Sequence, residues 1–185
     1  MTKQVFVPLV SLASGDADSF LELRSEQDLS GQHDCFFNLG IGLKPAVLEA
    51  RRALQTLPEF VFDGSIYIAG ACPTLASPKD VALALALCPW LLQANFLFGR
   101  CFVLGHLSFP EAKDGHITVT AGRYLQEQLQ AVLRLGYQVE PALLIIPTSD
   151  VETDYLHFAE KNIAVRPVAT LTAAYEKCIS SYLVG

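Results

Sequence analysis

The chain has 185 residues, of which 51% are hydrophobic and only 17% are charged, and its formal net charge is -6 at pH 7. This length suits one compact domain with a large core, so we expect a single domain over residues 1–185. The acidic balance argues against strong autonomous DNA binding, because phosphate neutralisation normally demands a basic excess. So few charged residues predict either a large core or apolar surface that another subunit covers.

The cysteines and the first residues indicate the compartment. There are five cysteines, an odd number without a CxxC pair, which is typical of buried reduced thiols. The apolar run near the N-terminus alternates like a strand and ends in the turn 14–16, which favours a strand over a signal peptide. We therefore expect a cytoplasmic protein.

The first half of the chain predicts early strands and one amphipathic helix. Strands are expected at 4–12, 20–24, 35–39 and 65–71, a polar connection at 26–32, a glycine break at 40–42 and a helix at 44–57. The helix follows from apolar residues at helical spacing opposite charged ones, with a proline in its first turn.

The segment 77–93, SPKDVALALALCPWLLQ, fits a membrane span, a buried helix or the remains of a catalytic loop. Ser77 is a good N-cap and Asp80 a favourable first-turn acid, so a helix is expected at 78–88, ending near Pro89. A membrane span needs about 20 apolar residues, and this run is interrupted by proline and polar residues. Because a helix that is apolar all round is typically buried, the core helix is favoured.

The second half of the chain predicts alternating strands and helices. Strands are expected at 100–107, 116–120, 142–146 and 164–168, a polar turn at 110–115, and helices at 121–135, 150–161 and 170–183. The strands before and after the turn are expected to pair as a hairpin. This order predicts an α+β fold in which a mixed sheet packs against helices.

Familiar catalytic and metal motifs are missing. The GIGLK stretch at 40–44 does not have the Walker-loop spacing, and the four histidines lie in separate expected elements. His33 and Cys35 could share a strand face, but a Cys–His nucleophile also needs an oxyanion site and an orienting group. The acidic residues near 152–160 favour a solvated helix face. We expect no cofactor and no metal site.

The order of several segments carries a family resemblance. The segment FFNLGIGLKPAVLEARRAL precedes a strand and the Pro-Lys-Asp turn at 78–80. After this turn come, in order, an Ala/Leu helix, FVLGHLSF, a hairpin, TAGRYLQEQLQAVLRLGYQ, ALLIIP and IAVRPVATLTAAYEKC. Over residues 4–180 this resembles the Lon-type protease domain superfamily. It is most similar to the N-terminal domain of magnesium-chelatase-like competence proteins (ComM type) and to the C-terminal domain of RadA-type recombination factors. The resemblance implies a ribosomal-S5-domain-2-like fold and assembly in rings.

The departures from the family concern its catalytic dyad. Lon-type proteases use a serine in a Gly-Pro-Ser-Ala-Gly run shortly after Pro-Lys-Asp, whereas here Val81 follows at once. The family's lysine falls ten residues before the glycine that ends the next helix; counting back from Gly136 reaches Gln126. A carboxamide cannot serve as the base, so the resemblance implies a domain without protease activity.

Two hypotheses about function follow. The first is a non-catalytic domain that acts in assembly or binding: a homo-oligomer, with a chelatase-like or DNA-processing ATPase as a possible partner, no membrane association, and nucleic acid suggested by family analogy alone. The second is an enzyme with a replaced site, in which Lys79, Asp80, His106 and Arg123 converge and His106 carries the proton. The simpler roles are helix capping and solvation for Lys79 and Asp80, a solvated first-turn position for Arg123, and a polar edge position for His106. Together with Gln126, they are the candidate site residues.

Overall fold

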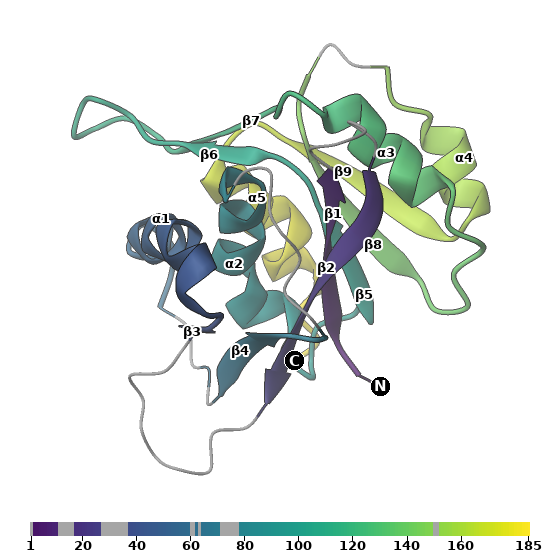
Figure 1. Ribbon diagram of the computed structural model, residues 1–185, viewed down its shortest axis with the longest axis horizontal. Helices are drawn as coiled ribbons and strands as arrows, with labels where there is room; N and C mark the ends of the chain where they lie inside the picture. Colours follow the sequence, from purple (N-terminus) through teal and green to yellow (C-terminus); the bar gives the residue numbers. More distant parts are fainter. Residues whose placement is uncertain are drawn as a thin grey trace.

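The computed structural model describes residues 2–10, 17–26, 37–59, 62, 64–70, 78–149 and 152–185, which build a mixed sheet with helices on both faces (Figure 1). The strands are β1 (Gln4–Val10), β2 (Ala17–Glu26), β3 (Phe37–Asn38), β4 (Ser65–Ile68), β5 (Arg100–Val103), β6 (His106–Ser108), β7 (Thr118–Thr120), β8 (Ala142–Pro147) and β9 (Ile163–Val168). The helices are α1 (Lys44–Leu54), α2 (Lys79–Leu91), α3 (Leu125–Leu133), α4 (Tyr155–Glu160) and α5 (Leu171–Cys178), with short 3-10 helices at Ile41–Leu43 and Ser180–Tyr182.

Seven strands form one sheet in the order β3-β4-β2-β1-β5-β8-β9, and β6 pairs antiparallel with β7 in a separate hairpin. Within the sheet β2 runs antiparallel to its neighbours β1 and β4, and the remaining pairings are parallel. The predicted mixed sheet packed with helices is confirmed, and so is the predicted hairpin. The strand expected at 142–146 lies inside the sheet, between β5 and β9, and is buried along its whole length.

Side-chain alternation along the strands divides the core into two layers. In β8, Leu143 and Ile145 pack with α1, α2 and α5, whereas Leu144 and Ile146 pack with α3 and α4. Figure 1 shows the same division, with α1, α2 and α5 on one side of the sheet and α3 and α4 on the other. Successive strand residues point to opposite faces, so a strand that is apolar throughout serves both layers.

Helix α2 lies at the centre of the first layer. All its residues from Val81 to Leu91 are buried, which agrees with the predicted core helix. The predicted end near Pro89 is wrong, because the helix continues through it to Leu91. A proline here removes one N–H donor only two residues before the helix ends, and the N–H of Leu92 still donates to the carbonyl of Cys88 at 3.0 Å. None of the described helices has both the length and the apolar character to cross a membrane.

One of the crossover connections between parallel strands has an uncommon handedness. The chain crosses from β4 to β5 through α2 and from β8 to β9 through α4, moving the same way along the sheet each time. Because α2 and α4 pack on opposite faces, the two crossovers have opposite hands. About 98% of such crossovers are right-handed, so one of the two belongs to a rare topological class.

Several predicted boundaries are wrong for local reasons. The strand expected at 100–107 is interrupted by Gly105, whose φ of +121° turns the chain out of β5 before β6 begins. The helix expected at 150–161 starts only at Tyr155, because Asp154 caps it by accepting the N–H of His157 at 2.9 Å. The helix expected at 170–183 is capped by the side chain of Thr170 but ends at Cys178.

Two further helices are shorter than predicted, and some predictions fall outside the description. The helix expected at 44–57 ends at Leu54, after which the chain continues in a turn, and the helix expected at 121–135 spans only Leu125–Leu133. Several predictions concern residues outside the described ranges: the turn at 14–16, most of the connection at 26–32, the N-cap Ser77, and both His33 and Cys35.

Candidate functional site

His106 lies just beyond the carboxyl end of β5, in the position that the bend at Gly105 creates. A Cβ at residue 105 would stand 3.0 Å from Cγ1 of Val119, so glycine provides both the required φ and the space. The hairpin register places Thr120 opposite His106. The carboxyl ends of parallel strands are where α/β sheets usually position ligands, so this edge is the first place to search for a site.

Asp80 approaches the same point from the first turn of α2. Its Oδ1 lies 2.5 Å from Nε2 of His106, and the two side chains are 12% and 22% exposed. A carboxylate is favoured at this end of a helix by the unsatisfied N–H groups and the helix dipole. The contact therefore joins α2 to the β6–β7 hairpin through a half-buried carboxylate–imidazole couple.

Gly122 sets the position of the imidazole ring. A Cβ at this residue would stand 2.8 Å from Nε2 of His106, closer than a side chain tolerates. Any larger residue would displace the ring from Asp80. The sequence analysis did not single out Gly122, although the register of the predicted hairpin places it two residues beyond the partner of His106.

The couple can orient a proton carrier. A carboxylate bonded to one imidazole nitrogen holds the ring in place and leaves Nδ1 to exchange a proton. General acid–base chemistry on a bound molecule is thus within its reach.

The three remaining candidate residues are exposed. Lys79 is exposed at the start of α2, next to Asp80 in the chain. Arg123 is exposed, and its guanidinium carbon lies 5.4 Å from the ring centroid of Tyr124. Gln126, which matches the family's lysine by count, is exposed on α3. The structure brings Asp80 and His106 together and leaves the other three at the surface.

A second histidine–carboxylate pair, on α4, has the geometry of a helix cap. Nδ1 of His157 lies 2.8 Å from Oδ2 of Asp154, with the side chains 63% and 50% exposed. The backbone N–H of His157 lowers the pKa of Asp154, since its hydrogen bond favours the charged carboxylate. Among the described residues no group of three or more histidine, cysteine or acidic side chains could hold a metal ion.

Comparisons with known proteins add no assignment. No protein-family model matches this chain, and no curated protein matches it. The resemblance to the Lon-type superfamily, which depends on motif order, therefore stays a prediction.

Proposed function

We propose that this chain is a non-catalytic domain of the Lon-protease-like type, with a ribosomal-S5-domain-2-like fold, that acts through binding and oligomeric assembly. The observation that carries the proposal is the burial of α2 immediately after the Pro-Lys-Asp turn. Val81 and Ala82, the first residues after Asp80, are both fully buried. A nucleophile in this segment would be sealed inside the core, out of reach of a polypeptide substrate.

The position matched to the family's lysine supports the same conclusion. Gln126 lies on the exposed side of α3, and its neutral carboxamide does not accept a proton from a serine. Both halves of a Ser–Lys dyad are thus replaced, one by a buried apolar helix and the other by a surface amide. What remains at the equivalent edge of the sheet is the Asp80–His106 couple.

Exposed apolar side chains support assembly with other subunits. The large hydrophobic residues that are more than half exposed are Leu48, Leu97, Tyr137, Val139, Tyr155, Leu156 and Val184. They occur on α1, on α4 and in the turns, in a chain of low charge. Contact with another subunit would remove such surface from water, which is the usual driving force of association.

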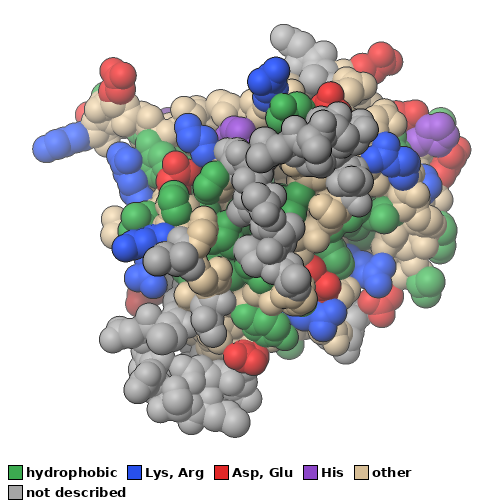
Figure 2. Space-filling view, viewed as in Figure 1, with side chains coloured by type: hydrophobic (Ala, Val, Ile, Leu, Met, Phe, Trp, Pro, Cys, Tyr) green, Lys and Arg blue, Asp and Glu red, His purple; other side chains and the backbone are tan. Residues whose placement is uncertain are grey.

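The family resemblance supports a chelatase-like or DNA-processing ATPase as the partner, and residues 1–185 do not contain the Walker-loop spacing. A basic strip on α1, formed by Lys44, Arg51 and Arg52, is exposed. Figure 2 shows Lys and Arg side chains along the left of the molecule, where α1 lies in Figure 1. This strip is the part of the described surface best suited to an acidic partner or to nucleic acid.

The mass of the protein in solution tests the proposed oligomeric assembly. Light scattering on a size-exclusion column, over a concentration series, should give a stable oligomer near the ring sizes of the family. Leu156→Lys, at a 72% exposed position on α4, tests one exposed patch, and Gln130→Lys on α3 is the matched control for an added surface charge. A monomer at every concentration would overturn self-assembly. A normal mass for both variants would exclude α4 from the interface.

The Asp80–His106 contact favours a second candidate, an enzyme with a replaced site. In it, Asp80 orients the ring, His106 transfers the proton, and Lys79 and Arg123 stabilise developing negative charge. Hydrolysis of p-nitrophenyl acetate provides a generic probe of such a base. His157, which also contacts an aspartate but is far more exposed, offers a matched control.

The two candidate functions predict different rates of p-nitrophenyl acetate hydrolysis for the variants. For an enzyme, His106→Ala lowers the rate by about 100-fold or more, whereas His157→Ala leaves it unchanged. For the non-catalytic domain, both variants hydrolyse the ester at the same slow rate as the wild type. In that case Lys79→Ala and His106→Ala retain the wild-type mass in solution.

A further inference from the structure

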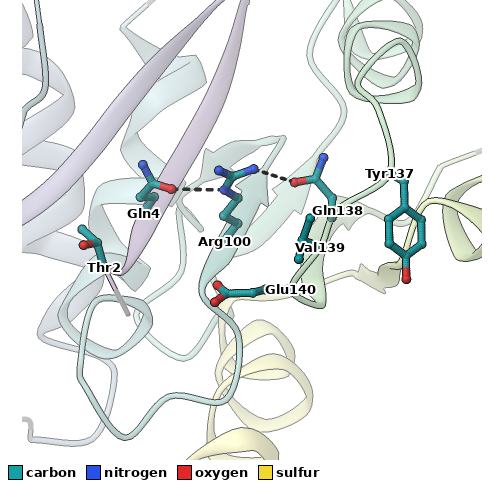
Figure 3. A pocket seen from close by; sticks show the side chains of 7 residues that line it. All are labelled: Thr2, Gln4, Arg100, Tyr137, Gln138, Val139 and Glu140. Atoms are coloured by element: carbon teal, nitrogen blue, oxygen red, sulfur yellow. Dashed lines mark hydrogen bonds between the residues drawn. The ribbon is translucent and has the colours of Figure 1, made fainter.

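A polar pocket lies at the amino-terminal ends of β1 and β5, at the edge of the sheet opposite the Asp80–His106 couple (Figure 3). Its volume is about 390 Å³. Its wall is built from the first residues of the two strands and from the turn that precedes β8, and it includes Gln4, Arg100, Tyr137, Gln138, Val139 and Glu140. Small-molecule sites typically enclose about 300 to 1,000 Å³, so this pocket has room for a small ligand.

The guanidinium of Arg100 is held in place by two neutral side chains. Nε donates to Oε1 of Gln4 at 3.1 Å, and Nη1 donates to Oε1 of Gln138 at 2.9 Å. Figure 3 shows both bonds, one on each side of the guanidinium. Gln138 is 6% exposed, and its Nε2 donates to the carbonyl of Gly136 at 2.9 Å. Arg100 is therefore oriented before any ligand arrives, which lowers the entropic cost of binding.

The positive charge of Arg100 has no carboxylate partner in the described part of the chain. Gln4 donates from Nε2 to Glu22 at 2.6 Å, but the same oxygen of Glu22 pairs with Nε of Arg24 at 2.5 Å. Glu22 thus orients Gln4 while its charge is matched by Arg24. A guanidinium has five N–H donors, and the two bonds to carboxamides leave Nη2 and one hydrogen of Nη1 for another acceptor.

A carboxylate lines the same pocket without pairing with Arg100. Glu140 forms no ion pair with Arg100, although both contribute to the wall. The ammonium of Lys3 is attracted to Glu140, but it donates to the carbonyls of Phe96 and Phe98. The pocket wall therefore carries one cation, Arg100, and one anion, Glu140.

Two further wall residues, Tyr137 and Val139, present exposed apolar surface. Tyr137 is 67% exposed and Val139 is 89% exposed. In Figure 3, Tyr137 lies on the far side of Gln138 from Arg100, and Val139 lies between Gln138 and Glu140. Apolar side chains this exposed gain free energy when a ligand covers them.

We infer that this pocket binds a zwitterion of the α-amino-acid class. The ligand carboxylate bonds to the open edge of the Arg100 guanidinium, as planar bidentate pairs do. The ligand ammonium pairs with Glu140, and an apolar ligand side chain packs against Tyr137 and Val139. A simple anion is disfavoured by Glu140 and a simple cation by Arg100, so recognition requires both charges on one small molecule.

Isothermal titration calorimetry with L-leucine and L-phenylalanine tests the inference. N-acetyl-L-leucine lacks the ammonium and L-leucine amide lacks the carboxylate, and each should bind about tenfold more weakly than L-leucine. Inorganic phosphate tests for an unselective anion site. The inference is overturned if neither free amino acid binds at millimolar concentration, or if phosphate or the N-acetyl derivative binds as tightly as L-leucine.

Substitutions assign the two charges to their roles. Arg100→Gln should weaken L-leucine binding by about tenfold or more, and Glu140→Gln should remove the preference for L-leucine over N-acetyl-L-leucine. Lys113→Gln, which also removes one positive charge, lies in the exposed turn between β6 and β7; it is the control and should bind as the wild type does. Thermal unfolding shows whether Arg100→Gln remains folded. Unchanged selectivity in a folded Glu140→Gln variant would overturn the role of the carboxylate.

Discussion

The burial of α2 can be tested by truncating Leu85 to alanine. Leu85 is fully buried in the layer between the sheet, α1 and α5. Each buried methylene contributes about 0.8 kcal/mol, and an unfilled cavity adds to this loss. Because alanine is the best helix former, the substitution removes packing without weakening the helix itself. We expect Leu85→Ala to lower the free energy of unfolding by about 3 to 5 kcal/mol.

Urea denaturation provides the measurement. Trp90, the single tryptophan of the chain, lies in α2 at 3% exposure, so its fluorescence follows the unfolding of this layer directly. Leu48→Ala is the matched control, because Leu48 is 59% exposed on α1. We expect the control to change stability by about 0.5 kcal/mol or less, with the same dependence on urea concentration for all three proteins.

Equal stability of the two variants would refute the reasoning. A loss of less than about 1 kcal/mol for Leu85→Ala would mean that α2 does not fill the core. The position after the Pro-Lys-Asp turn would then be accessible, and the main support for a non-catalytic domain would be lost.

Three further substitutions or reactions test individual contacts. Gly64→Ala should lower the melting temperature clearly, because its Cβ would stand 2.5 Å from the backbone oxygen of Glu26; an unchanged melting temperature would contradict this close approach. Thr170→Ala should destabilise the protein by about 1 kcal/mol in urea, since the hydroxyl accepts the N–H of Ala173, whereas Thr170→Ser should retain the cap. Burial raises the pKa of Cys178 from 9.0 to about 11, so its thiolate fraction at pH 8 falls by about 100-fold. Peptide mass spectrometry should therefore find alkylation of Cys178 much slower than after unfolding, and equal rates would exclude the buried position.

Local sequence patterns were sufficient to predict the helices and strands that have strong hydrophobic periodicity or a capping residue. The continuous apolar run of β8 indicated a strand buried on both faces, and the Ala/Leu run of α2 indicated a core helix. Helix α5 follows residue 170, where the predicted helix begins, because the hydroxyl of Thr170 caps the next turn of the same chain. In each case the deciding interactions are short in sequence or depend on the hydrophobicity of the element itself.

The predicted boundaries of strands and helices are wrong where the effect of a single residue outweighs the local sequence pattern. The predicted strand 100–107 is broken at Gly105, which has a positive φ and where a Cβ would lie 3.0 Å from Val119; the periodicity of the strand does not contain this close approach. Pro89 was expected to end α2, but its position near the helix end makes the missing hydrogen bond tolerable.

Only the tertiary structure decided which side chains meet. Asp80 and His106 were both candidates, yet their 2.5 Å contact and the glycine against the ring depend on how α2 and the hairpin dock on the sheet. The Arg100 pocket was not foreseen, because its partners Gln4 and Gln138 lie 96 and 38 residues away in the chain. Helix and strand periods describe neighbours within one element, whereas a site is assembled by the strand order and register, which bring distant residues to one edge of the sheet.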